Sequence, residues 1–252
     1  MNKKGRKISL LSFLVIVFVV FVFKSFALAK NLAQNQTAVG EVTKYKGRVV
    51  VKRKGEIRPF RVRKEHFKLF VGDCIKTKTN SKALILFIDG TKVLLDQKSV
   101  LCIQDYEKTG LKTGKVFFKV KKGIKGRRLV VSNILIGVKG TLFGVGFENS
   151  TGLVVEVKEG RVCVENLKGE FKKYEKKLKA SFEEFKKQRE IGVKKLNKEF
   201  EAYKKKVEKE FYEFVKKFEL KPGETVSIIN NEVKYIKPPK EFEEGFKLLE
   251  EW

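Results

Sequence analysis

A hairpin signal at residues 83–95 places the tightest constraint on the fold of this chain. Two apolar runs, 83–88 and 93–95, are separated by Asp89-Gly90. An Asp-Gly pair between apolar runs is typical of a type I′ turn, because both central residues of that turn need a positive φ. The first run, ALILFI, shows no polar alternation, so we expect both of its faces to be buried. The stretch therefore predicts an all-β core of the sandwich, roll or barrel kind.

The amino-terminal residues have the pattern of an export signal. Four basic residues lie within residues 1–7, an apolar block covers 8–23, and Ala27-x-Ala29 precedes Lys30. Basic, apolar and small residues in this order are typical of a secretory signal peptide, which predicts cleavage after Ala29 and a linker over 30–38. The alternative is an uncleaved anchor, although sixteen apolar residues fall short of the usual span of about twenty. Either way we expect the remaining chain outside the cytoplasm, periplasmic or secreted, or anchored to the inner membrane.

The net charge of +27 leaves two interpretations open. Such a charge attracts nucleic acid, anionic lipid and acidic glycans, of which export removes nucleic acid. A surface rich in Lys and Glu, in a chain with a single Met, is also typical of adaptation to heat. The sequence thus predicts either a solvated thermophile-like surface or an anionic partner at the cell envelope.

Short Val-rich runs separated by glycines predict a β domain over 39–167, closed by 219–237. Its cysteines, Cys74, Cys102 and Cys163, form no CxxC pair, and each lies in or beside a strand-like run, so we expect buried free thiols. A Cys74–Cys102 bridge is the alternative in an exported protein. The single histidine, His66, lacks a second metal-binding neighbour and is expected to be structural or solvated.

Five motifs in a fixed order resemble the FecR domain family. They read GD-x-I-x-T at 72–77, S-x-A-x-x-x-F-x-DGT at 81–91, S-x-L-x-I at 99–103, GVKGT-x-F at 137–143 and V-x-EG-x-V-x-V-x-N at 157–166. The motif residues expected to have structural roles are Gly72, Asp73, Asp89, Gly90, Gly137, Gly140 and Thr141. A later L-x-P-G-E at 220–224 is similar to the closing element of that family. The chain departs from the family at Ser132-Asn133-Ile134, where Thr-Pro is common, and at Lys139, where Arg is common.

The resemblance implies a β-rich, extracytoplasmic domain without enzymatic activity. In iron-transport regulators of the family this domain relays a signal across the membrane to a sigma factor. Only seven residues precede the apolar block in this sequence, fewer than a cytoplasmic signalling module needs. We therefore expect an exported binding or scaffold domain at the cell envelope, with a membrane-anchored regulator as the alternative.

Residues 168–218 change character and predict a long amphipathic helical insertion. Apolar residues recur at an average step of about 3.6, and the rest is mostly Lys and Glu. A bend or a helical hairpin is expected near Gly192, because the chain must return to the β domain. The stripe of candidate interaction residues comprises Phe182, Phe185, Phe200, Phe211 and Phe214. It could pack internally, mediate self-association or partner docking, or lie on an anionic membrane.

The carboxyl-terminal part predicts a hairpin turning at Asn230-Asn231 and a short helix within 238–252. Phe242, Phe246 and Leu249 fall on one side of that helix and are expected to dock on the core. The fold class predicted for the whole chain is mainly β, a FecR-like sandwich or roll of short antiparallel strands, with the long helical insertion.

The sequence carries no motif of the common catalytic schemes. It has one His and lacks HExxH, GxSxG and CxxC. Asp73 and Asp89 lie in turn motifs, where Asp commonly caps backbone amides. We therefore expect no catalytic residues, no metal and no cofactor, and a partner that is an envelope protein or an anionic envelope component.

Overall fold

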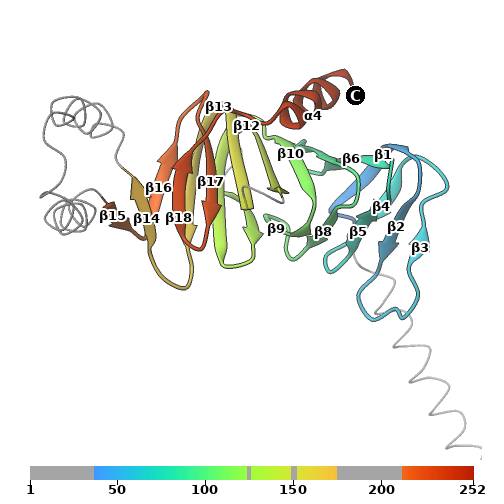
Figure 1. Ribbon diagram of the computed structural model, residues 1–252. Coiled ribbons are helices and arrows are strands. Elements are labelled where there is room, and N and C mark those ends of the chain that lie inside the picture. Colours follow the sequence, from blue (N-terminus) through green and yellow to red (C-terminus); the bar gives the residue numbers. More distant parts are fainter. Residues whose placement is uncertain (1–36, 124–125, 149–151, 175–211) are drawn as a thin grey trace, which may run out of the picture. The chain divides into compact units, whose positions relative to one another are not determined.

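The computed structural model describes residues 37–123, 126–148, 152–174 and 212–252. Ala38–Trp252 form one compact unit. Local sequence signals place most of its strands, and Figure 1 shows how they are arranged.

The central hairpin consists of β6 (Lys82–Phe87) and β7 (Lys92–Leu95), which pair antiparallel. Leu84 and Ile85 point to opposite faces of the sheet and are both buried, which confirms the predicted two-sided burial. The predicted turn type is wrong, because only Gly90 has a positive φ, of 78°. The turn is closed by Gly90 N donating to Phe87 O at 2.8 Å, and Asp89 Oδ1 accepts from Thr91 N at 2.8 Å. This is the three-residue loop whose last residue is left-handed.

The strands form two layers that share β12 and β13. Layer one contains, in spatial order, β4 (Phe67–Leu69), β1 (Gly40–Lys46), β6, β7, β10 (Lys115–Lys119), the second part of β12, the first part of β13, β17 (Thr225–Ile229) and β18 (Glu232–Tyr235). Layer two contains β3 (Phe60–Arg61), β2 (Val49–Lys52), β5 (Cys74–Thr77), β8 (Val100–Ile103), β9 (Lys108–Thr113), β11 (Arg127–Val131), the first part of β12, the second part of β13 and β16 (Lys217–Leu220).

The hairpin of β12 (Ile134–Glu148) and β13 (Gly152–Asn166) passes from one layer to the other. Its register is interrupted between Lys139 and Leu142, opposite Glu159-Gly160. A β-bulge bends a strand and increases its twist, so this point lets two long strands serve both layers. The GVKGT and EG motifs of the sequence thus lie at the bend, in the middle of Figure 1.

The main core fills the space between the two layers. Val42, Ile85 and Phe118 contribute from layer one, and Ile75 and Leu101 from layer two, all with essentially no exposed area. Most strands of a layer alternate one inward side chain with one outward side chain, as a two-layer packing requires.

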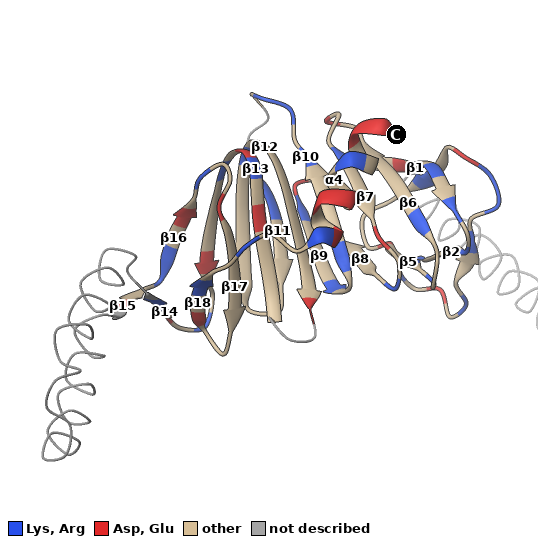
Figure 2. Ribbon diagram, turned by 45° about the horizontal axis from the view of Figure 1, so that its top comes forward, with Lys and Arg blue, Asp and Glu red and all other residues tan. Residues whose placement is uncertain are grey.

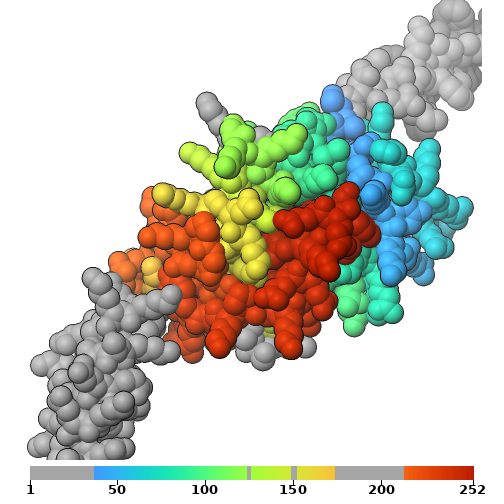
Figure 3. Space-filling model, turned by 90° about the horizontal axis from the view of Figure 1, so that it is seen from above, coloured from blue at the N-terminus to red at the C-terminus, as the bar shows by residue number. Residues whose placement is uncertain are grey.

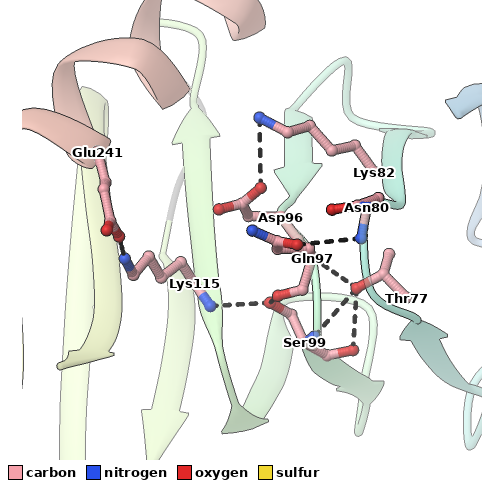
Figure 4. A network of polar contacts seen from close by, with 8 residues as sticks. All are labelled: Thr77, Asn80, Lys82, Asp96, Gln97, Ser99, Lys115 and Glu241. Carbon is pink, nitrogen blue, oxygen red and sulfur yellow. Dashed lines mark hydrogen bonds and ion pairs between the residues drawn. The ribbon is translucent and has the colours of Figure 1, made fainter. Parts of the chain in front are cut away.

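The two serines of the sequence motifs hold neighbouring turns together. Arg48 N donates to Ser81 Oγ at 2.8 Å, and Lys115 N donates to Ser99 Oγ at 2.9 Å. The residue before each serine has a positive φ of 53°. Figure 4 shows the second contact within a polar network that continues through the Lys115 ammonium to Glu241 of α4. The same local arrangement therefore occurs twice, which explains why serine stands in both motifs.

The outer face of layer one is covered by α4 (Lys240–Glu251). Phe242, Phe246 and Leu249 pack with Phe117 and Leu94 in a second buried cluster. The rings of Phe242 and Phe246 lie 5.5 and 5.2 Å from the ring of Phe117, both edge to face. Figure 3 shows the helix lying across the upper surface of the domain.

The predicted fold class is wrong in one part, the long amphipathic helical insertion over 168–218. The described ends of this segment are strands, β14 (Phe171–Tyr174) and β15 (Tyr212–Val215), which pair antiparallel, followed by β16. Across the residues that the structure describes, α4 is the one α-helix. Apolar residues at the ends of the segment alternate with a period of two once they join a sheet: Phe218 and Leu220 are buried, and the residues beside them are exposed. Residues 175–211 lie outside the described residues.

The prediction of three buried free thiols is also wrong, and the alternative, a Cys74–Cys102 bridge, is confirmed. Cys74 and Cys102 lie directly opposite each other in β5 and β8 and form a disulfide, and Cys163 is a free, exposed thiol on β13. Within the described ranges, no helix combines the length and the hydrophobicity that a bilayer span requires.

Candidate functional site

The outer face of layer two carries a groove where β11, β12, β13 and β16 lie side by side. The pairing register places Arg128 opposite Gly137, Gly137 opposite Cys163, and Cys163 opposite Glu219. Residues at alternate positions of these strands, such as Val138 and Val162, are buried in the core. The row from Arg128 to Glu219 therefore faces away from the core.

The groove has a volume of about 890 Å³. Gly137 and Gly160 line it without side chains, while Lys139 and Arg161, paired across β12 and β13, stand beside them. Small-molecule sites in proteins usually enclose about 300–1,000 Å³. The groove is thus large enough for a small-molecule ligand, and the GVKGT box forms part of its lining.

The charges around the groove are only weakly satisfied within the protein. The Arg128 guanidinium lies 3.8 Å from Glu107, and that of Arg161 lies 3.7 Å from Glu219. All four side chains are roughly half exposed or more, so these ion pairs contribute at most about 1 kcal/mol each. Lys139 has no ion pair within the described residues.

A buried ion pair fixes the edge of the groove. Arg127 is 2% exposed, and its Nε and Nη2 donate to Asp89 Oδ2 at 3.0 and 2.6 Å. The guanidinium also lies 4.1 Å from the centre of the Phe87 ring, a cation–π contact. Burial opposes ionisation of Asp89, but hydrogen bonds from Thr91 and Arg127 outweigh it and lower the pKa of this carboxyl. Asp89 therefore connects the central hairpin to β11.

The structure separates the predicted motif residues into two sets. Gly137 lines the groove, and Gly140 and Thr141 form the bend beside it. Gly72 and Asp73 lie in the turn before β5 and do not line the groove. Asp73 Oδ2 accepts from Phe70 N at 3.0 Å and from Arg53 Nη1 at 3.2 Å, and burial raises the pKa of the Asp73 carboxyl.

The predicted phenylalanine stripe does not contribute to this site. Phe182, Phe185, Phe200 and Phe211 lie outside the described residues. Phe214 lies in β15, on a strand rather than a helix, and is 61% exposed.

His66 is exposed, and its Nδ1 lies 2.9 Å from Glu41 Oε1. This hydrogen bond raises the pKa of His66. No group of three or more potential metal ligands occurs among the described residues.

Sequence reasoning missed Arg128 and Arg161, because residues that meet across strands are far apart in the chain. Lys139 was noticeable only as a departure from the arginine common in the family. Figure 2 shows that the described residues following β10, in the loop that leads to β11, also include Lys.

Comparisons with known proteins agree with the motif order. Residues 73–163 match the family described as "FecR protein". Two crystal structures of a "putative anti-sigma factor" from Parabacteroides distasonis ATCC 8503 are similar at 14% and 15% identity, with TM-scores of 0.42 and 0.41. The match covers 65% of this chain and 59% of those chains. No curated protein matches the chain. The family match contains the central hairpin, the GVKGT box and the EG turn, so residues 73–163 carry the similarity of this chain to the FecR family.

Proposed function

We propose that this chain is an exported FecR-type protein that acts without catalysis, by binding a partner at the cell envelope. The observation that carries the proposal is the groove of about 890 Å³ at the bend of β12 and β13, lined mostly by residues of the segment that matches FecR. The guanidinium groups of its exposed arginines make no close ion pair with the described residues, so their N–H donors remain available to a partner. A structural role alone does not require such a surface.

The Cys74–Cys102 disulfide supports export. Structural disulfides persist mainly in oxidising compartments such as the periplasm or the extracellular space. Cys163 offers a direct test, because it is the one free thiol of the three cysteines. A maleimide that cannot cross the inner membrane should label Cys163 in intact cells and should not label a Cys163→Ser variant. Labelling only after lysis would contradict export.

Binding is tested by sedimentation of the full chain with isolated cell envelopes. We expect the wild type to sediment and the variant Arg128→Gln/Lys139→Gln/Arg161→Gln to remain largely in solution. A control variant, Lys44→Gln/Lys52→Gln/Lys76→Gln, removes the same charge from exposed positions on β1, β2 and β5. If both variants dissociate equally, net charge and not the groove causes the association.

A membrane-anchored signal-transducing regulator is the second candidate, and the FecR match favours it. The two candidates differ at the amino terminus. A mature protein that begins at Lys30 supports the free exported protein, whereas an intact chain retained in the inner membrane supports the regulator. Sequencing of the amino terminus from fractionated cells decides between them.

A further inference from the structure

Three cationic side chains, from three neighbouring strands, line the groove. Arg128 stands opposite Gly137, Lys139 follows Gly137 on the same face, and Arg161 stands opposite Lys139. Neighbouring strands are about 4.8 Å apart, and next-but-one residues of a strand lie about 7 Å apart. Side chains as long as Arg and Lys can therefore contact one ligand above Gly137 when Arg128 and Arg161 turn away from Glu107 and Glu219.

The donors of these side chains are available. No hydrogen bond from the Arg128 or Arg161 guanidinium to another described residue is present, since Glu107 and Glu219 lie at 3.8 and 3.7 Å. Arg161 is 74% exposed. Exposed ion pairs of this length are weak, so a ligand can exchange with the two carboxylates at little cost. Arg127, by contrast, is already committed to Asp89.

The composition of the donor set selects the ligand class. Two guanidinium groups offer planar pairs of N–H donors, and the ammonium adds a third positive charge. A carboxylate has two oxygens and one negative charge, whereas a phosphate group presents up to three terminal oxygens and up to two charges. These three cations against the two carboxylates of the lining leave a positive charge that a phosphate neutralises more fully.

We propose that the groove binds a phosphate group, held by Arg128, Lys139 and Arg161. The inference rests on the proposed function, because it names the ligand chemistry of the same groove. The phosphate can come from a free ion or from a lipid phosphomonoester headgroup, and both present at least three terminal oxygens.

Cys163 provides a local readout, because it lines the groove and is the free thiol of the chain. The experiment measures the alkylation rate of Cys163 by N-ethylmaleimide in the purified full chain, with inorganic phosphate in one arm and phosphatidic acid vesicles in the other. We expect at least one probe to slow alkylation in a saturable manner, and the arm that does so identifies the source. General attraction of a basic protein to vesicles would leave Cys163 accessible.

The variant Arg128→Gln/Lys139→Gln/Arg161→Gln should raise the apparent Kd about tenfold or more, because charge-assisted contacts are lost. The control Lys44→Gln/Lys52→Gln/Lys76→Gln should keep the wild-type Kd. Glu219→Gln should bind more tightly than the wild type, since it removes a competing carboxylate. Unchanged melting temperatures establish that the exposed substitutions leave the fold intact.

The proposal is overturned if neither probe slows alkylation, if protection persists in the groove variant, or if the control loses protection equally. Its failure is distinguishable from failure of the proposed function. If envelope sedimentation depends on the groove but phosphate does not protect Cys163 from alkylation, only the proposed ligand is rejected. Phosphate protection in a chain that stays in the cytoplasm rejects only the envelope role.

Discussion

Asp89 acts both as the capping residue of its turn and as the partner of a buried charge. Its Oδ1 accepts from Thr91 N, and its Oδ2 accepts from Arg127. The first contact is local and follows from the Asp-Gly pattern. The second joins residues 38 positions apart, so no local pattern could predict it. A buried guanidinium needs such a carboxylate partner, so the motif aspartate is required for the ion pair as well as for the turn.

Glu156 is a buried carboxylate that should reduce stability at neutral pH. It is 1% exposed, Lys158 Nζ lies 3.1 Å from Oε1, and Oε2 has no hydrogen-bond donor among the described residues. Burial raises the pKa of Glu156 above its ordinary value near 4.5, and Glu243 of α4 adds to the effect. A raised pKa means that the protonated form favours the folded state. That stability is present below about pH 4.5 and is lost as the pH rises through the folded-state pKa.

We therefore expect Glu156→Gln to stabilise the protein by about 1 kcal/mol at pH 8, because an amide has no charge to desolvate. The gain should shrink towards zero at pH 4. Thermal unfolding between pH 4 and pH 8 measures it. Glu170→Gln, at an exposed position, is the control and should change little. A Gln variant that is less stable than the wild type at pH 8 would mean that the Lys158 contact outweighs the cost of burial.

At the scale of the element, α4 depends on a glycine in its middle. A Cβ at Gly245 would lie 2.1 Å from Cζ of Phe117, which is fully buried. Gly→Ala inside a helix ordinarily stabilises by about 1 kcal/mol. Here the methyl group overpacks the contact with layer one, so we expect Gly245→Ala to destabilise by about 1–3 kcal/mol instead.

The emission of Trp252, the single tryptophan of the chain, reports on docking of α4, since it packs partly buried against the same cluster. Gly245→Ala should shift this emission to the red. Lys247→Ala, at a side chain that is 80% exposed, should not. A more stable Gly245→Ala protein with unchanged emission would show that the helix can move away from Phe117 without loss.

The disulfide joins β5 and β8 across a sequence separation of 28 residues. Closing a loop of this length restricts the unfolded chain and is worth about 3–4 kcal/mol. The double substitution Cys74→Ser/Cys102→Ser should therefore lower the free energy of unfolding by roughly that amount, measured by denaturant titration. Dithiothreitol should destabilise the wild type similarly and leave the double variant unaffected. Cys163→Ser, at the exposed thiol, should unfold like the wild type.

Local patterns predicted the elements whose signals are local. The apolar run before Asp89 and the Asn230-Asn231 turn, whose residues have φ of 49° and 66°, illustrate this. The segment after Asn166 was misassigned because a few aromatic residues fit both a helical and a strand period. Phe218 and Leu220 follow the strand period because they pair with the neighbouring strand β13, and the local sequence does not show that pairing.

At the scale of the whole molecule, the groove and the disulfide both depend on register. Cys74 meets Cys102 because β5 pairs with β8, and Arg128 approaches Lys139 because β11 pairs with β12. The sequence supplied the residues and, through the FecR resemblance, the β architecture. It could not supply which outward residues become neighbours, because a shift of one residue turns every side chain to the other face.

The shared hairpin of β12 and β13 should make the two layers unfold as one cooperative unit. Both layers contain parts of these two strands, and the strands change layer where Gly160 meets Gly140. A Cβ at Gly160 would lie 2.5 Å from the carbonyl oxygen of Gly140, and Gly160 has a φ of 77°. Gly160→Ala should therefore weaken both layers, by about 1–3 kcal/mol from backbone strain alone.

Circular dichroism follows the strands of both layers, while Trp252 fluorescence follows layer one and its helix. We expect the two signals to give the same transition in the wild type, and to move together to lower temperature in Gly160→Ala. Gly169→Ala, where a Cβ meets nothing within 4 Å, should leave the transition unchanged. Separate transitions for the two signals would mean that the layers fold independently. In that case the bend would only connect them, and a ligand in the groove of layer two could not influence α4 on layer one through the stability of the hairpin.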